Sequence, residues 1–173
     1  MGQYSYIPDE FFSQPEYTQF QRCARPVSAQ YGDFQYFLDN PKAPNKRPRL
    51  NLLGVGDPET PFFKGCLPNA KELTALELAN ICRSSFMASF SIRSIRLLSS
   101  WSGKTGFAQE LANILGQPVK AATGVVYMHW SQYNSHVFIE KNREPNVVRN
   151  ERNFKWYEPS LRAYPSPNMF ISY

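Results

Sequence analysis

Residues 50–58 read Leu50-Asn51-Leu52-Leu53-Gly54-Val55-Gly56-Asp57-Pro58, a short apolar run that ends in glycines and a proline. A run of this length bounded by turn residues is typical of a buried strand. A second such run, Ser94–Ser99, ends at Ser100-Trp101-Ser102-Gly103, and Pro118–Ala122 forms a third. We therefore expect three buried strands in this part of the chain.

Two amphipathic helices are expected between these strands. Thr74 and Glu77 have the spacing of a capping box, and the apolar pattern after them predicts a helix that runs to about Met87. Thr105 is expected to cap the second helix, and Gly116 suits the left-handed residue just past its end. Helical crossovers of this kind require parallel strands.

The predicted fold class is thus α/β, with a short, mainly parallel sheet flanked by helices. Residues 124–128 and 136–139 alternate in polarity around a polar turn, which adds an antiparallel C-terminal hairpin. A length of 173 residues fits one domain. Within it we separate an aromatic-rich segment, 1–49, expected to pack on the core, from the α/β domain, 50–173. A short helix over Glu16–Cys23 is also compatible with the sequence.

Composition narrows the class of protein. Apolar residues make up 42%, too many for a disordered chain, and no apolar run is long enough to cross a bilayer. The first residues lack the basic and apolar regions of a signal peptide. We therefore expect a cytoplasmic protein, or one secreted by a route that needs no cleavable signal. The net charge of +5 is spread along the chain, apart from the run 45–49. We interpret that run as a solvated linker, so nucleic acid is an unlikely partner.

The cysteines do not suggest a metal site. Cys23, Cys66 and Cys82 form no C-x-x-C pair, and the only two histidines lie far downstream. No cofactor or metal is expected, and reduced thiols are the simplest interpretation. Cys82 falls on an apolar helix face, whereas Cys66 is the one thiol near the expected site.

Ligands of open parallel sheets bind at the carboxyl ends of the strands. Two such ends carry loops of small residues, so the candidate cleft residues are Gly54, Gly56, Asp57, Ser99, Trp101 and Gly103. Glycines allow a ligand to approach the backbone closely, although glycines after strands are more often plain turns.

The wider pattern resembles a known family. It consists of Leu-Leu-Gly-x-Gly-Asp-Pro at 52–58, Ile-Arg-Leu-Leu-Ser at 95–99, and the run from Phe107 to Tyr127. Together these resemble the caspase-like modules of bacterial polymorphic toxins and effectors, which are related to gingipains and to toxin self-processing cysteine peptidases. The resemblance covers about residues 50–130 and implies a caspase-like fold and a protein or peptide partner.

The resemblance also assigns the catalytic positions. In that family a histidine stands between the two glycines and a cysteine follows Leu-Leu-Ser. Here Val55 occupies the histidine position and Ser100 the nucleophile position. Valine cannot accept a proton, and a serine hydroxyl is a poor nucleophile without a base. An engineered cysteine-to-serine change at Ser100 would not explain Val55.

Two hypotheses follow for function. In the first, the chain is a degenerate, non-catalytic toxin-like or effector-like module that acts by binding a partner. In the second, it is an active hydrolase or transferase that uses Ser100, with a base from His129, Asp57 or Glu59. The second requires a hydrogen bond between the Ser100 hydroxyl and one of those groups.

Overall fold

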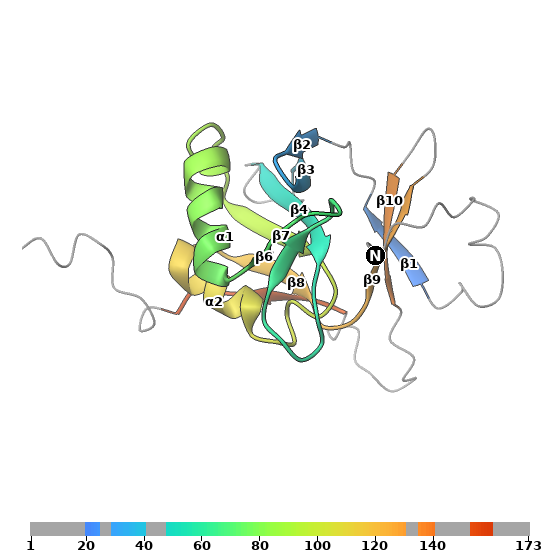
Figure 1. Cartoon of the computed structure of the whole chain (residues 1–173). Helices are drawn as coiled ribbons and strands as arrows, with labels where there is room; N and C mark the ends of the chain where they lie inside the picture. The colour runs from blue at the N-terminus through green and yellow to red at the C-terminus, as the bar shows by residue number, and fades with distance from the viewer. Residues whose placement is uncertain (1–19, 25–28, 41–47, 131–134, 141–152, 161–173) are drawn as a thin grey trace, which may run out of the picture.

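The structure is a computed structural model that describes residues 20–24, 29–40, 48–130, 135–140 and 153–160. For residues 20–24, 129–130 and 135–140 only the backbone is described. The protein is α/β, with helices and strands as shown in Figure 1. In chain order the elements are β1 (Phe20–Ala24), β2 (Ala29–Tyr31), β3 (Phe34–Asp39), β4 (Arg49–Val55), β5 (Phe63–Gly65), β6 (Glu72–Leu73), α1 (Ala75–Ile81), the π-helix η3 (Cys82–Met87), β7 (Ser94–Leu98), α2 (Phe107–Leu115), β8 (Val119–Ala122), β9 (Val126–Trp130), β10 (Ser135–Glu140) and β11 (Phe154–Tyr157).

The main sheet has eight strands, six of which follow the order β11-β8-β7-β4-β3-β2, while β5 pairs with β4 and β6 pairs with β5. Its centre is the predicted strand–helix–strand–helix–strand unit. There β4 pairs with β7 and β7 pairs with β8, both in parallel, with Leu50 opposite Ile95 and Ile95 opposite Val119. The expectation that the runs from Leu50 and from Ser94 lie side by side and point the same way is confirmed.

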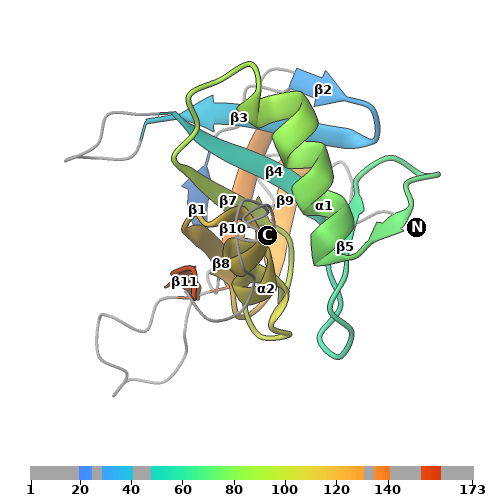
Figure 2. The same ribbon diagram turned by 90° about the vertical axis from the view of Figure 1, so that its left-hand side faces the viewer.

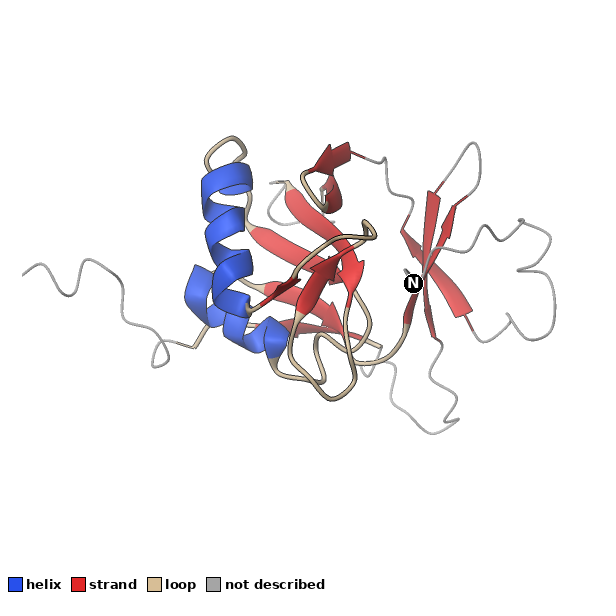
Figure 3. Cartoon of the chain, in the orientation of Figure 1, coloured by secondary structure: helices blue, strands red, loops and turns tan. Residues whose placement is uncertain are grey.

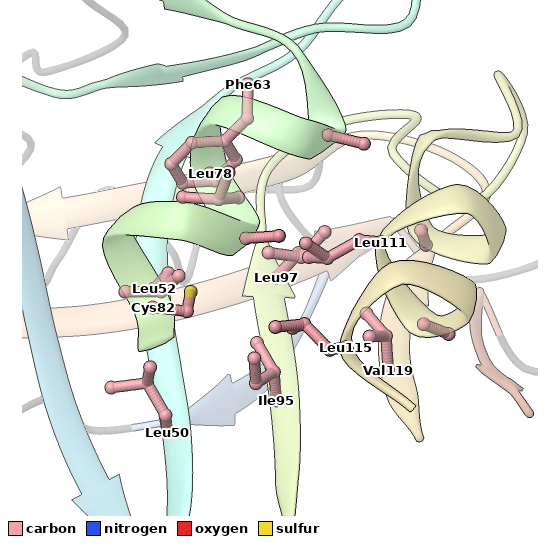
Figure 4. Close-up of a cluster of buried hydrophobic side chains, with 14 of the residues drawn as sticks. Leu50, Leu52, Phe63, Leu78, Cys82, Ile95, Leu97, Leu111, Leu115 and Val119 are labelled. Atoms are coloured by element: carbon pink, nitrogen blue, oxygen red, sulfur yellow. The ribbon is translucent and has the colours of Figure 1, made fainter. Parts of the chain in front are cut away.

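One face of this sheet is covered by α1 and α2, which pack against each other and lie in front of the strands in Figure 2. The strands present leucine, isoleucine and valine to the helices at every second position, as strand geometry requires. Figure 4 shows the resulting core, in which both helices contribute. Its fully buried members include Leu50, Leu52, Leu78, Ile95, Leu97, Leu111 and Val119.

The first helix begins and ends where the sequence predicts. Thr74 accepts a hydrogen bond from the Glu77 amide, and the Glu77 carboxylate accepts one from the Thr74 amide, so the capping box is complete. The helix continues beyond Ile81 as η3 and ends at Met87. Gly116 adopts the left-handed conformation after α2, also as predicted.

The opposite face of the main sheet meets a second, three-stranded sheet of order β1-β10-β9. Figures 1 and 3 show this sheet on the side away from the helices. The predicted C-terminal hairpin is its β9–β10 pair, in which His129 stands opposite His136. Val126 and Met128 of β9 share an apolar cluster with Leu53 and Leu98, which joins the two sheets.

The prediction of a mainly parallel sheet is corrected, because the sheet is mixed. Its outer pairs β11–β8, β2–β3 and β3–β4 are antiparallel. The added strands come from segments with weak sequence signals. The turn between β2 and β3 is made by Gly32 and Asp33, where a φ of 53° at Gly32 suits a tight hairpin turn.

Three local predictions also differ from the structure. The helix expected over 16–23 falls partly outside the described residues, and residues 20–23 form a strand that pairs with β10. The proline-containing stretch 57–71, where the sequence predicts a loop and no strand, contains β5, which pairs with the last residues of β4 because Gly54 leaves room for the ring of Phe63. The cap of α2 is Gly106, with a φ of 85°, rather than Thr105.

Candidate functional site

The candidate site is the edge of the main sheet where β4 and β7 end. The parallel register of these strands runs to Leu53 opposite Leu98. Beyond this pair β7 ends and the chain turns at Ser99, while the last residues of β4, Gly54 and Val55, pair with β5. Of the two positions that the family resemblance singles out, Ser100 lies against Gly56, the residue that follows Val55.

Close backbone packing confirms that the two loops touch. Gly56 is buried, and a Cβ atom at this position would overlap the carbonyl oxygen of Ser100. Only glycine permits this approach. The Gly-Val-Gly pattern after β4 therefore serves packing: Gly54 accommodates Phe63, and Gly56 accommodates the loop that follows β7.

Ser100 is fully buried and its hydroxyl is already engaged. Its Oγ donates a hydrogen bond to the carbonyl oxygen of Val126, at 3.2 Å, and accepts one from the amide of Val126, at 3.0 Å. A serine nucleophile must instead give its proton to a base. Both partners of this hydroxyl are backbone groups, which do not serve as that base.

The other two serines of this loop also have structural roles. Ser99 and Ser102 are buried, and their hydroxyls are hydrogen-bonded to each other. The amide of Gly103 donates to the carbonyl oxygen of Ala122, at 2.8 Å. A Cβ at Gly103 would meet the hydroxyl of Tyr157, so this glycine too is required by packing.

Trp101 has an unusual backbone. Its φ is 58°, which makes it the one non-glycine residue with a positive φ in the part of the chain that the structure describes. This conformation is rare for a bulky residue. It is held by two hydrogen bonds, from the Trp101 amide to Gly124 and from the Thr105 amide to Trp101. The side chain is half-buried.

Within the residues that the structure describes, no hydrogen bond joins Asp57 or Glu59 to the Ser100 hydroxyl. Asp57 folds back on its own turn, where its Oδ1 accepts hydrogen bonds from the amides of Glu59, at 2.8 Å, and Thr60, at 3.3 Å. Glu59 is exposed. The backbone of His129 lies in β9, but its side chain is outside the described part, so its proposed role stays a prediction.

The two described thiols are buried. Cys66 lies in the apolar cluster with Leu53 and Leu98, and Cys82 lies in the core under the helices. Burial raises the pKa of the Cys66 thiol and that of the Cys82 thiol to about 12. Because the thiolate is the reactive form, neither is suited to nucleophilic chemistry. The side chain of Cys23 is outside the described residues.

A buried polar network lies on the sheet face opposite the helices, and sequence reasoning missed it. Asp39 of β3 accepts hydrogen bonds from Arg49 and Asn51 of β4, and lies 3.6 Å from Nη2 of Arg96 in β7. Asn51 also accepts from Nε of Arg96, at 2.6 Å. The only sequence signal was polar residues at alternate positions of otherwise apolar strands.

The chain matches no protein-family model, no curated protein and no solved structure. Within the described residues, no three histidine, cysteine or acidic side chains gather in a way that could hold a metal ion. None of the helices in that part is long and apolar enough to cross a membrane.

Proposed function

We propose that this chain is a non-catalytic, caspase-like module of the toxin or effector type, which acts by binding a protein or peptide partner. The order of β4, α1, β7, α2 and β8, with two parallel pairs, supports this assignment. So does the contact of Gly56, next to Val55, with the backbone of Ser100, because it brings together the two loops where the related peptidases carry their histidine and cysteine.

One observation carries the proposal. The hydroxyl at the nucleophile position is removed from solvent and hydrogen-bonded in both directions to Val126. Activation of this hydroxyl would require breaking both bonds and bringing in a base, since the valine at the histidine position, Val55, cannot accept a proton. Binding, by contrast, needs only the preserved scaffold, and fold and function can separate in this way.

The experiment is a peptide-hydrolysis assay with a broad substrate panel. It compares the native chain with Ser100→Ala and, as a matched control from the same buried turn, Ser99→Ala. The proposal expects no turnover above buffer for any of the three. Turnover by the native chain that is lost in Ser100→Ala and kept in Ser99→Ala would overturn it and favour the hydrolase hypothesis.

Expression in a bacterial host tests the binding role. If the chain acts through its surface, any effect on growth persists in Ser100→Ala as long as circular dichroism shows that the variant is folded. An effect of the native chain that is lost in a folded Ser100→Ala variant would contradict the binding role and favour the hydrolase hypothesis.

A further inference from the structure

The turn after β7 runs antiparallel to the segment that leads from β8 into β9. The amide of Gly103 donates to Ala122, at 2.8 Å, and the amide of Trp101 donates to Gly124, at 2.9 Å. These bonds have the alternate spacing of an antiparallel ladder. Continued in the same direction, the ladder would next reach Val126.

At Val126 the backbone pair is replaced by a side chain. The hydroxyl of Ser100 donates to the carbonyl oxygen of Val126 and accepts from its amide, at 3.2 and 3.0 Å. A hydroxyl carries one donor and two acceptor sites, so it can make both bonds at once. Alanine can make neither, and a thiol is a weak partner in both roles.

The backbone of Trp101 is part of the same arrangement. Its φ of 58° is maintained by the hydrogen bonds that bracket the residue. Non-glycine residues keep such a conformation only where the surrounding structure imposes it. The strain is therefore located at the residue where the ladder passes from backbone bonds to the Ser100 side chain.

We propose that Ser100 is a structural fastener, whose hydroxyl forms the last rung of this ladder and couples the end of β7 to the first residue of β9. Since β9 belongs to the sheet β1-β10-β9, the rung ties that sheet to the main sheet. Serine at this position is then a fitted residue rather than a remnant of a lost cysteine. The inference goes beyond the proposed function and does not rest on partner binding.

Amide hydrogen exchange of the full chain, followed by NMR, tests the rung directly. In Ser100→Ala the Val126 amide loses its acceptor, and we expect its exchange to accelerate about tenfold relative to the amides of β8. Ser100→Cys should accelerate it in the same direction. Ser99→Ala is the control, because Ser99 is equally buried in the same turn but bonds to Ser102. It should leave the relative rate at Val126 unchanged.

An unchanged Val126 rate in Ser100→Ala, or an equal acceleration in Ser99→Ala, would overturn the inference. If Ser100→Ala does not fold, the exchange rate of the Val126 amide in the native chain still tests the inference. A Val126 amide that exchanges as fast as one in an unstructured peptide is incompatible with a hydrogen bond to Ser100. Hydrolysis assays on the same variants are read separately. Substrate turnover by the native chain would contradict the proposed function. Only the exchange rate of the Val126 amide tests the role of Ser100 as a fastener.

Discussion

Arg49 and Asp39 face each other across β4 and β3 and are joined by two hydrogen bonds, from Nε to Oδ1 at 2.9 Å and from Nη2 to Oδ2 at 2.6 Å. This bidentate geometry is the strong form of the arginine–carboxylate pair. Arg96 and Asn51 extend it to β7, so one carboxylate links three strands. The pair fixes an antiparallel strand onto the parallel centre of the sheet.

We expect Asp39→Asn to lower the free energy of unfolding by about 3 kcal/mol, because it leaves the buried Arg49 and Arg96 without their carboxylate. Urea unfolding measures this. Lys71→Ala provides the control, since it removes the exposed ion pair with Glu77 and should cost no more than about 0.5 kcal/mol. Equal effects of the two substitutions would show that the network contributes little.

The same carboxylate predicts a pH dependence. Burial alone would raise the pKa of Asp39, but the hydrogen bonds from Arg49 and Asn51 and the charges of Arg49 and Arg96 outweigh it and hold the pKa below its ordinary value of 3.8. The stability that Asp39 contributes is therefore present above about pH 4 and is lost as the pH falls through the lowered pKa. Below about pH 4, the free energy of unfolding of the native chain should fall more steeply with decreasing pH than that of Asp39→Asn. Identical pH dependence in the two proteins would refute this assignment.

Gly56→Ala tests the contact between the two loops of the candidate site. The added Cβ would overlap the Ser100 carbonyl oxygen, so we expect a loss of about 3 kcal/mol in the free energy of unfolding. Gly116→Ala is the comparison: its Cβ meets open space, and only its left-handed φ of 64° opposes the change. It should cost about 1 kcal/mol. A Gly56→Ala variant as stable as Gly116→Ala would mean that the loops do not touch.

The thiols give a fourth prediction. With Cys23 replaced by serine, Cys66 and Cys82 should both resist a thiol-reactive reagent at pH 8, because burial raises the pKa of each to about 12. Both should react once the chain is unfolded in denaturant. Rapid reaction of Cys66 in the folded chain would restore it as a candidate nucleophile.

The parallel centre of the sheet could be predicted from the sequence because its signals are local. The strand β4 is marked by the apolar run Leu50–Leu53, and the helix that follows it in the sequence is marked by the capping box at Thr74. The antiparallel strands lack such signals. In β5, Phe63 pairs with Leu73 within a segment broken by prolines, and its packing depends on Gly54, which lies outside it.

The sequence predicts that β4 and β7 end at the same edge of the sheet, but it does not predict the hydrogen bonds of the Ser100 hydroxyl. The direction of the two strands is enough to predict that the loops after β4 and β7 meet, as Gly56 and Ser100 do. The state of the Ser100 hydroxyl depends on Val126, which follows 26 residues later, and on the left-handed backbone of Trp101. Neither is encoded in a local pattern. The Asp39–Arg49 pair was missed for the same reason, since it exists only once β3 joins β4.

The central claim is that the hydroxyl of Ser100 is not a nucleophile. Incubation of the folded chain with a serine-directed organophosphorus probe, followed by mass spectrometry of the peptide that contains Ser100, measures this directly. The account predicts no adduct on Ser100 in the native chain. Stoichiometric labelling of Ser100 that depends on the folded state, and that is absent after Ser100→Ala, would contradict it.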